Sequence, residues 1–502
     1  MEDIVSRHLI NPDMLLHEHD TETGELTKIY TREEFYTLID RWKIVLVDKY
    51  NVQPGKTICP LLWPSIPYYA LVFAAAELGL TFIVGWPHCE SERDLNDYKV
   101  SMYGQIDYVV IHSDHKKPTH PKYVGHWEMQ RNYKYSKTIC YEEDLYTYDI
   151  TQCKRITEII NTIWAKPDMD LLWSSSSGTT GLPKRLSDSH KKVYRMGQRL
   201  CGQMFKKNVS VMHVENIHHG ASLCYYFLPA FMVGGRSYTA HGQHGLRGPS
   251  IRQGDPGSLD PVIDFVIENK ITQVFMFRTE HAEYFLEHMP KVDFELNLIT
   301  LLQITPKMVR LMKEKNVNWI KTSFGDTTIG MGFLTKHVDQ TTDEATFDTA
   351  NMGPLRDDFW QLEVRDGQLW IACKELDQDW QTSGDAFEVI NEDFYFSGRA
   401  NQYRIEMDWI KLNELESAVK ELFGPLGANI VVDPDWQKIY LALWKPNPEA
   451  ESELNKFFEN NYENARVSYV LQDVEHYSFF NGRKIDNSKI REVCRENILK
   501  GK

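Results

Sequence analysis

Residues 175–184 read Ser175-Ser176-Ser177-Gly178-Thr179-Thr180-Gly181-Leu182-Pro183-Lys184, and they follow a short apolar segment, 169–173, that is typical of a strand end. The glycines let backbone N–H groups turn toward an anion, and the hydroxyl groups donate further hydrogen bonds. Lys184 adds a full positive charge at the far end. The stretch therefore predicts a phosphate-binding loop, although its spacing is not that of a Walker loop. The alternative is a flexible Ser/Gly linker, which rarely ends in Leu-Pro-Lys.

The eight residues 177–184 resemble the phosphate-binding signature of the adenylate-forming superfamily, Ser-Gly-Thr-Thr-Gly-x-Pro-Lys-Gly, position for position. That superfamily of AMP-dependent synthetases and ligases includes acyl-CoA synthetases, non-ribosomal-peptide adenylation domains and luciferases. Arg185 replaces the last glycine, and His190 sits where relatives often carry a histidine. The resemblance makes Lys184 a candidate catalytic cation, and it gives six further candidates for nucleotide binding: Ser176, Ser177, Gly178, Thr179, Thr180 and Gly181.

The composition is that of a globular chain of 502 residues, long enough for two or more domains. Its net charge of −15 argues against non-specific binding to nucleic acid, which requires a basic surface. The eight cysteines form no Cys-x-x-Cys pair and the first residues resemble no secretory signal, so we expect a reduced, cytoplasmic protein. The most apolar stretch, 68–86, predicts a core helix, a turn and a strand rather than a membrane span.

The hydrophobic periodicity predicts an α/β fold, with a large N-terminal domain of layered sheets and helices (1–399) and a small α+β C-terminal domain (400–502). The resemblance places the family's hinge at the same boundary, with Asn401 in the hinge position, and implies that the C-terminal domain is mobile. In the N-terminal domain we expect helices at 31–50, 261–269 and 280–287, and strands at 57–62, 209–214, 273–277, 360–364 and 368–373. In the C-terminal domain we expect helices at 412–422, 450–459 and from 487, and strands at 429–432, 439–443 and 468–471.

A second stretch, Phe324-Gly325-Asp326-Thr327-Thr328, resembles the family's Tyr-Gly-x-Thr-Glu. By that resemblance Phe324 would stack on adenine beside Gly325 and Asp326, and Thr327 would bond the phosphate of AMP. Thr328 replaces the glutamate that helps to hold Mg²⁺ in the family. A hydroxyl group is a poor substitute for a carboxylate on a hard divalent cation, so Asp326 is the second candidate metal ligand.

Asp385 lies at a glycine turn, where its carboxylate could accept hydrogen bonds from the two vicinal hydroxyls of a ribose. Taken alone, the residue would be an ordinary turn aspartate. The family has a Thr-Gly-Asp at this place, and Gly398-Arg399 follows at the expected distance. The resemblance therefore predicts ribose binding by Asp385 and Arg399.

Two further candidates carry the acid-activating chemistry. His218-His219 matches the place where the family has an aromatic or histidine side chain at the acyl site, so His219 is a catalytic candidate; the alternative is a core or surface histidine. The run 481–486 resembles the family's Gly-Lys-Ile/Val-Asp, whose lysine contacts the carboxylate and the α-phosphate. Arg483 is inserted before Lys484, which is our candidate because Ile-Asp follows it, and Arg483 is the fallback. Without the resemblance, either would be a solvated turn charge.

The resemblance implies an enzyme that binds ATP and Mg²⁺, activates a small carboxylic acid as an acyl-adenylate and passes the acyl group to a thiol, with coenzyme A the first choice. Transfer to an amine, a carrier protein or a nucleic acid is the first alternative, and a non-catalytic nucleotide-binding relative is the second. Two departures bear on this choice. Residues 301–305 lack the Gly-Gly pair that floors the family's acyl pocket, and 401–408 lack its glycine. The sequence does not predict which acid is used.

Overall fold

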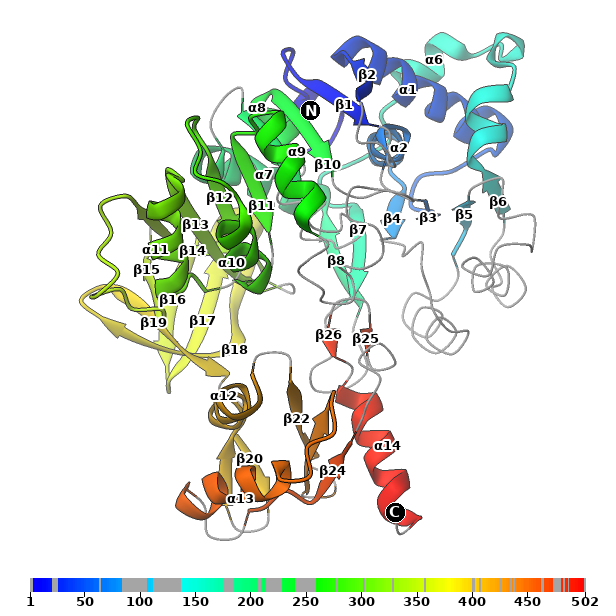
Figure 1. Cartoon of the computed structure of the whole chain (residues 1–502). Coiled ribbons are helices and arrows are strands. Elements are labelled where there is room, and N and C mark those ends of the chain that lie inside the picture. The colour runs from blue at the N-terminus through cyan, green and yellow to red at the C-terminus, as the bar shows by residue number, and fades with distance from the viewer. Residues whose placement is uncertain are drawn as a thin grey trace. The chain divides into compact units, whose positions relative to one another are not determined.

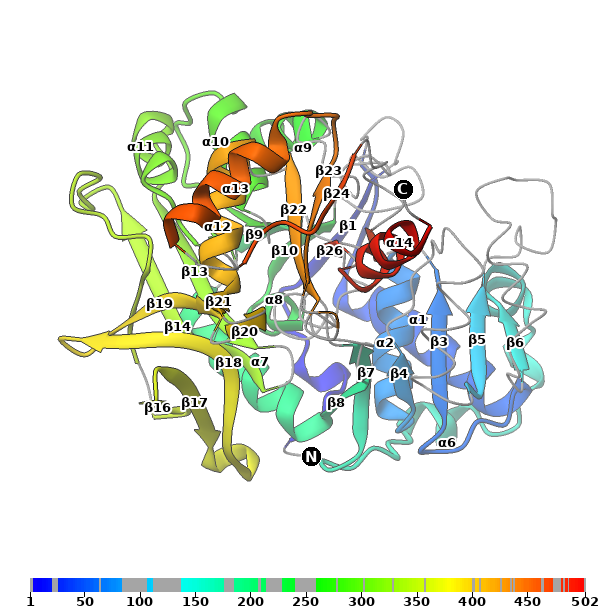
Figure 2. The ribbon, with the colours of Figure 1, turned by 90° about the horizontal axis from the view of Figure 1, so that it is seen from below.

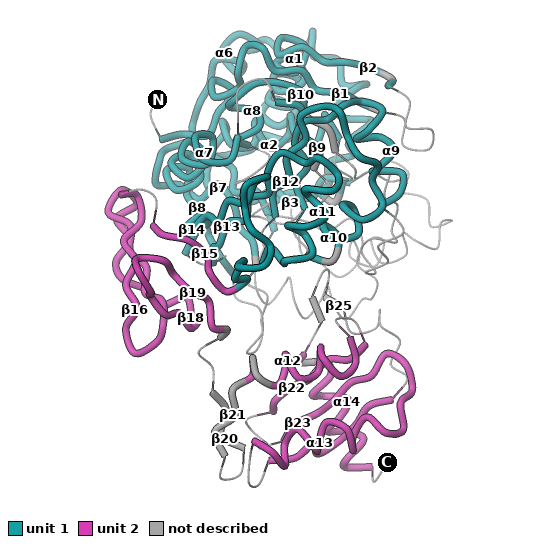
Figure 3. Tube along the Cα trace, turned by 60° about the vertical axis from the view of Figure 1, so that its left-hand side comes forward, with its two compact units in different colours: residues 1–176, 184–251, 255–349 teal, residues 177–183, 252–254, 350–502 magenta. Residues whose placement is uncertain are grey.

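The chain divides into two compact units (Figure 3). The first comprises residues 1–176, 184–251 and 255–349, and the second comprises 177–183, 252–254 and 350–502. The predicted boundary after Arg399 lies inside the second unit and stays a prediction. This computed structural model describes residues 3–19, 26–62, 65–83, 106–111, 137–175, 185–205, 209–213, 228–239, 259–276, 279–300, 303–326, 329–355, 358–399, 402–405, 408–424, 427–433, 436, 438–461, 465–472, 480–481, 484–485 and 487–500.

The first unit contains an eight-stranded sheet and a six-stranded sheet, both mostly parallel (Figure 1). The larger sheet has the order β14 (Gly330–Asp339), β13 (Trp319–Asp326), β12 (Asn297–Thr300), β11 (Gln273–Met276), β9 (Val209–His213), β10 (Gly235–Thr239), β1 (Leu15–His19) and β2 (Leu26–Tyr30). The smaller sheet has the order β6 (Lys137–Cys140), β5 (Tyr108–Ile111), β3 (Thr57–Leu61), β4 (Thr81–Ile83), β7 (Asp170–Ser175) and β8 (Arg185–Ser189).

Eight α-helices accompany these sheets in the described part of the first unit: α1 (Arg32–Ile44), α2 (Ile66–Glu77), α6 (Ile156–Asn161), α7 (His190–Met204), α8 (Leu228–Val233), α9 (Asp260–Glu268), α10 (Thr279–His288) and α11 (Pro306–Lys315). Helices α9, α10 and α11 share one apolar core with strands β11 to β13. Figure 2 shows α1 and α2 beside the strands of the smaller sheet. The predicted alternation of strands and helices is confirmed, and the one long apolar stretch is the core helix α2 followed by strand β4.

Helix α1 begins where the sequence predicts. The Thr31 hydroxyl accepts a hydrogen bond from the Glu34 N–H, and the Glu34 carboxylate accepts one from the Thr31 N–H. This reciprocal capping box satisfies two backbone donors that a helix start otherwise leaves unpaired. The helix then continues as a π-helical turn over Val45–Lys49, so the expected span of 31–50 is helical nearly throughout.

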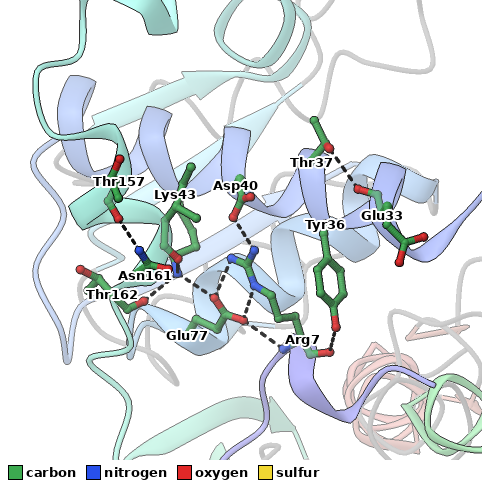
Figure 4. A network of polar contacts seen from close by, with 11 residues as sticks. Arg7, Glu33, Tyr36, Thr37, Asp40, Lys43, Glu77, Thr157, Asn161 and Thr162 are labelled. Carbon is green, nitrogen blue, oxygen red and sulfur yellow. Dashed lines mark hydrogen bonds and ion pairs between the residues drawn. The ribbon is translucent and has the colours of Figure 1, made fainter. Parts of the chain in front are cut away.

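A buried network of charges ties the N-terminal segment to α1 and α2 (Figure 4). The Glu77 carboxylate accepts hydrogen bonds from the Arg7 backbone N–H (3.0 Å) and from its Nε and Nη2 (2.8 and 2.9 Å). It also accepts one from Lys43 Nζ at 2.7 Å, while Asp40 pairs with Arg7 Nη1. Lys43 Nζ donates in addition to the Ile160 and Thr162 carbonyls, so the network links the helices to the 160–162 segment as well.

The second unit contains a five-stranded antiparallel sheet and a small α+β portion. The five-stranded sheet has the order β15 (Asn351–Pro354), β19 (Asp393–Arg399), β18 (Gln378–Ile390), β17 (Gln368–Cys373) and β16 (Gln361–Arg365). The α+β portion contains β20 (Gln402–Ile405), β21 (Asp408–Lys411), α12 (Leu412–Phe423), β22 (Ala428–Asp433), β23 (Lys438–Leu443), α13 (Ala450–Asn461), β24 (Tyr469–Leu471), β25 (Phe480–Asn481), β26 (Lys484–Ile485) and α14 (Asn487–Leu499).

Side-chain alternation along β22 and β23 buries both faces of their sheet. Ile430, Ile439 and Leu441 belong to one core with residues of α12 and α13, whereas Val431 and Tyr440 pack with residues of α14. Since successive residues of a strand point to opposite faces, helices cover the sheet on both sides. The helices predicted at 412–422, 450–459 and from 487 are thereby confirmed.

Among the described residues, none of the helices combines the length and the apolar content that crossing a bilayer requires. The six cysteines that the structure describes are free thiols. The cytoplasmic location stays a prediction.

Candidate active site

Four parallel strands of the eight-stranded sheet, β9, β11, β12 and β13, end at the same edge of that sheet. In open α/β sheets, ligands bind outside the carboxyl ends of the strands. The segment after β9 carries the predicted His219, and β13 carries Phe324, Gly325 and Asp326 at its end. The topology therefore places the end of β9 and the predicted adenine motif at one edge, whereas His219 itself lies outside the described residues.

Phe324 lies near the end of β13, where the strand turns back into β14. It is half-buried and pairs with Leu334 across the ladder, and the register shifts between Phe324 and Asp326. Such an irregularity re-aims the side chains next to it. Phe324 is thus an aromatic group at the carboxyl edge of the sheet, as adenine stacking requires.

Gly325 is the residue at this irregularity, and no side chain fits there. A Cβ atom at position 325 would lie 2.7 Å from Met331 Cα and 2.8 Å from the Gly330 carbonyl oxygen. Both atoms belong to the backbone of the neighbouring strand, so the overlap cannot be relieved by a rotamer change. The glycine is therefore required by the close approach of two strands.

We expect Gly325→Ala to weaken ATP binding about tenfold or more and to destabilise the first unit by roughly 1–3 kcal/mol, because β13 and β14 must separate. Calorimetric titration with ATP and urea unfolding measure the two effects. Gly202→Ala is the matched control, since nothing lies within 4 Å of a Cβ added to that helical glycine. Wild-type affinity in Gly325→Ala would contradict the role of this turn.

Asp326 closes the turn that follows Phe324. Its Oδ1 accepts a hydrogen bond from the Ile329 N–H at 3.1 Å, which fixes the carboxylate. Mg²⁺ in nucleotide sites is usually held by one or two carboxylates together with substrate phosphates, and Asp326 provides one such oxygen donor. No group of three potential metal-binding side chains occurs in the described ranges. The Asp326 carboxylate therefore fits a magnesium ion that is held together with a nucleotide.

The segment after β12 is firmly anchored where relatives have a Gly-Gly pair. The Gln303 carbonyl accepts a hydrogen bond from the Thr279 hydroxyl at 3.0 Å, and Ile304 is fully buried. The Thr305 hydroxyl caps α11 by accepting from the Met308 N–H. Residues 303–305 are therefore fixed at the start of α11, whereas residues 301 and 302 lie outside the described residues.

Strands β7 and β8 form an antiparallel pair whose connection is the predicted phosphate loop. Ser175, the last residue of β7, pairs with Arg185, the first of β8. The predicted loop residues themselves lie outside the described residues: Ser176, Ser177, Gly178, Thr179, Thr180, Gly181 and Lys184. The structure thus describes both ends of the loop and places them side by side.

His190 is buried in the first turn of α7. Its Nδ1 accepts a hydrogen bond from the Val5 N–H at 3.2 Å, so the proton of the neutral ring is on Nε2. Burial lowers the pKa of His190 to about 4. The side chain is 0% exposed, and its described contact is with the N-terminal segment. This histidine holds the N-terminal segment against α7.

We expect the free energy of unfolding of the first unit to fall as the pH is lowered from 6.5 to about 4. In that range the unfolded chain binds a proton at His190 that the folded chain does not. His190→Asn keeps an acceptor for Val5 and removes the titration. The free energy of unfolding of the variant minus that of the wild type should therefore be about 2–3 kcal/mol larger at pH 4.5 than at pH 7. A constant difference between the two proteins, measured by urea unfolding, would contradict this prediction.

Asp385 and Arg399, the predicted ribose pair, face each other across the β18–β19 ladder. Directly opposite residues of an antiparallel pair have Cβ atoms about 5 Å apart. Gly384, just before Asp385, adopts φ +71°, which favours glycine. The Asp385 N–H donates to the Ser383 hydroxyl, and the side chain is 7% exposed. Asp385 therefore lies within β18 rather than in the glycine turn that the sequence predicted, and its backbone is paired with that of Arg399.

Lys484 is the first residue of β26 and pairs with Asn481 of β25. Gly482 and Arg483 connect the two strands and lie outside the described residues. The pairing fixes the register of Lys484 in a hairpin, whereas Arg483 belongs to the connection. Three other candidates, Thr327, Thr328 and His219, also lie outside the described residues.

Sequence reasoning missed one contact beside the phosphate loop. The guanidinium of Arg185 lies over the ring of Trp173, with its central carbon 4.3 Å from the ring centroid. The sequence predicts that Trp173 lies at a strand end, and it shows Arg185 only as the residue that replaces the last glycine of the family signature. Recognition of β8 as the antiparallel partner of β7 would have put both side chains on one face.

Comparison with known proteins returns matches to solved structures, but none to a protein-family model or to a curated protein. O-succinylbenzoate coenzyme A synthetase from Bacillus subtilis, in complex with AMP, aligns over 96% of both chains with a TM-score of 0.70 and 14% identity. Fatty acyl-adenylate ligases from E. coli and L. pneumophila align over 98% of this chain and 97% of theirs, with a TM-score of 0.71 and 11% identity.

A third similar structure is the amide bond synthetase from Marinactinospora thermotolerans, which aligns over 97% of this chain and 98% of its own, with a TM-score of 0.68 and 12% identity. The Bacillus subtilis enzyme has also been solved with ATP and a magnesium ion. At these identities the likeness shows the fold, and the predicted fold class is confirmed.

Proposed function

We propose that this chain, which has the fold of the adenylate-forming ligases, uses ATP to convert a carboxylic acid into an acyl-adenylate, with release of pyrophosphate. One observation carries the proposal: the likeness extends over nearly the whole chain and joins ligases that bind AMP or ATP. The adenine motif lies at the end of β13, the phosphate motif follows β7 in the sequence, and Asp385 of β18 pairs with Arg399 at the end of β19. Each motif alone has an ordinary structural explanation, whereas their occurrence together in this fold favours the enzyme.

In the proposed reaction a carboxylate oxygen attacks the α-phosphorus of ATP. A bond forms between that oxygen and phosphorus, the bond from phosphorus to the bridging oxygen breaks, and pyrophosphate leaves with the electron pair. No proton is transferred in this step. The protein must therefore align two anions and stabilise the charge that develops between them.

The residues take the following roles in this proposal. Lys184 and the loop donors hold the departing phosphates. Phe324 stacks on adenine, and the facing pair of Asp385 and Arg399 holds the ribose. Lys484 bridges the attacking carboxylate and the α-phosphate. Thr327 bonds the same phosphate, and His219 borders the acid.

Magnesium enters as a proposed cofactor, held by Asp326 and the nucleotide phosphates, with Thr328 as a weaker oxygen donor. When bound, the ion neutralises phosphate charge and orients the leaving group. The hydrogen bond from the Ile329 N–H orients the Asp326 carboxylate before the ion binds. That bond occupies one carboxylate oxygen and limits how the group can turn.

For the second step we propose transfer of the acyl group to a thiol, with coenzyme A as the first candidate. The similar structures include ligases that differ in acceptor, among them a coenzyme A synthetase and an amide bond synthetase. Transfer to an amine, a carrier protein or a nucleic acid is therefore the second candidate. A protein that binds ATP without turnover is the third, and Thr328 in place of a glutamate favours it.

ATP–pyrophosphate exchange with Mg²⁺, measured against fatty, aromatic, hydroxy and amino acids, tests the proposal. We expect exchange that depends on one class of acid. Product analysis with coenzyme A or an amine then identifies the acceptor. ATP binding without exchange for any acid would favour the non-catalytic relative, and absence of ATP binding would overturn the proposal altogether.

A further inference from the structure

Arg185 and Trp173 form a stacked pair at the base of the β7–β8 hairpin. The guanidinium carbon lies 4.3 Å from the centroid of the indole ring. The ring is itself fixed, because its Nε1 donates a hydrogen bond to Asp170 Oδ2 at 2.7 Å. Trp173 pairs with Ser187 and Arg185 pairs with Ser175, so both side chains belong to the same face of the hairpin. The cation is therefore held on a rigid aromatic platform.

Stacking of this kind leaves the guanidinium free to bind an anion. The face of the planar group contacts the ring, whereas its five N–H donors point outward from its edge. Arg185 is exposed, and no acceptor is paired with its guanidinium in the ranges that the structure describes. The stacking restricts the rotamers of Arg185 while its N–H donors bind none of the described residues, which is the arrangement expected of a pre-organised anion contact.

The sequence position of Arg185, next to the predicted phosphate loop, indicates which class of anion it would bind. Arg185 directly follows Lys184 and pairs with Ser175, so it is the first residue after the segment of glycines and hydroxyl residues. A second cation adjacent to Lys184 favours a ligand with several negative charges over a single phosphate group. Pyrophosphate and the β- and γ-phosphates of ATP meet this requirement, whereas the single phosphate of AMP does so less well.

We propose that Arg185, held by Trp173, is a second cationic contact for the β- and γ-phosphates of ATP and for pyrophosphate. In this proposal Trp173 is a positioning residue, because its role is to fix the guanidinium rather than to contact the ligand. The inference rests on the proposed function only in naming the ligand, since polyphosphate binding can be measured without any acid. It predicts that binding of ATP and pyrophosphate depends on this pair more than binding of AMP does.

Calorimetric titration of the full-length protein with ATP, inorganic pyrophosphate and AMP, each with Mg²⁺, tests this inference. Arg185→Gly should weaken pyrophosphate and ATP about tenfold and leave AMP within a factor of about two, because one charge-assisted contact is lost. Arg185→Lys keeps the charge without the planar fork, so it should lose less than Arg185→Gly. The loss in Arg185→Gly should shrink at high salt, since the contact is exposed.

Variants of Trp173 separate the effect of stacking on the Arg185 side chain from the effect of its charge. Trp173→Phe keeps an aromatic face and should bind pyrophosphate nearly as the wild type does, whereas Trp173→Leu should weaken it several-fold. A thermal-shift measurement on each variant verifies that it is folded. Equal loss of AMP and pyrophosphate in Arg185→Gly, or wild-type affinity for all three ligands, would overturn the inference.

The outcome is independent of whether an acid is activated. If the wild type binds pyrophosphate and Arg185→Gly weakens it while no acid supports exchange, the inference stands and the proposed function fails. If exchange is found but Arg185→Gly binds pyrophosphate normally, the function stands and the inference fails. Failure of the wild type to bind ATP and pyrophosphate overturns both.

Discussion

Replacing Lys484 with alanine is expected to lower the rate of acyl-adenylate formation by roughly 10²–10³ while ATP binding stays within a few-fold of the wild type. The physical reason is that this cation is proposed to contact the attacking carboxylate and the α-phosphate together, where negative charge concentrates as the bond forms. In the proposed site, ATP in the ground state is held by other residues, among them Phe324 and Asp385. Exchange rates and calorimetric ATP binding, measured on the same preparation, separate the two effects.

The hairpin β25–β26 supplies the matched control. Lys484 pairs with Asn481, and Arg483 is the neighbouring cation in the connection between the strands. Arg483→Ala removes one positive charge from the adjacent position in the sequence, so a general electrostatic effect would appear in both variants. We expect Arg483→Ala to retain exchange within about threefold. Wild-type exchange in Lys484→Ala together with loss in Arg483→Ala would move the role to Arg483.

Much of the fold was predictable because its elements have local signals. Thr31 and Glu34 cap α1 by a capping box that can be read from two residues three apart. The helices of the second unit show clear periodicity, and Gly79 separates α2 from β4 as a turn with φ +62°. The division of the chain near residue 350 was not predictable, because it depends on how strands 351–399 pair with one another rather than on any local pattern.

The candidate site was predictable only where the motif residues are adjacent in sequence or share a known spacing. The facing of Asp385 and Arg399 across a ladder confirms that these two residues lie together, although the ribose they are proposed to hold is untested. The requirement for glycine at position 325 could not be predicted from the sequence, because the atoms that exclude a side chain there belong to another strand. The burial of His190 could not be predicted either, since its hydrogen-bond partner Val5 is 185 positions away in the sequence.

Glu77→Gln is expected to destabilise the protein by about 3–5 kcal/mol. Glu77 is 1% exposed and compensates two buried cations, Arg7 and Lys43. The amide keeps the shape of the side chain but removes the charge, so Arg7 and Lys43 remain buried with only Asp40 as a charged partner among the described contacts. Urea unfolding at pH 7 measures the change.

Two variants and a pH series make this prediction specific. Lys43→Met should lower the free energy of unfolding by less than Glu77→Gln does, because Arg7 still donates to Glu77 through its backbone N–H and two side-chain N–H groups. Glu158→Gln, in the exposed pair with Arg155, should leave the urea midpoint unchanged. A midpoint of Glu77→Gln equal to that of Glu158→Gln would contradict a stabilising role for the network.

The pH dependence follows from the pKa of Glu77. Burial raises that pKa, but the hydrogen bonds from Arg7 and the charges of Lys43 and Arg7 outweigh burial and hold the pKa below its ordinary value of 4.5. The unfolded chain therefore takes up the proton first as the pH falls. The stabilisation is fully present above about pH 4.5 and is lost below it, as the pH falls through the pKa of the folded state. Since Glu77→Gln cannot titrate, the difference between variant and wild type should narrow in acid, and a difference independent of pH would show that the carboxylate is not the source of the stability.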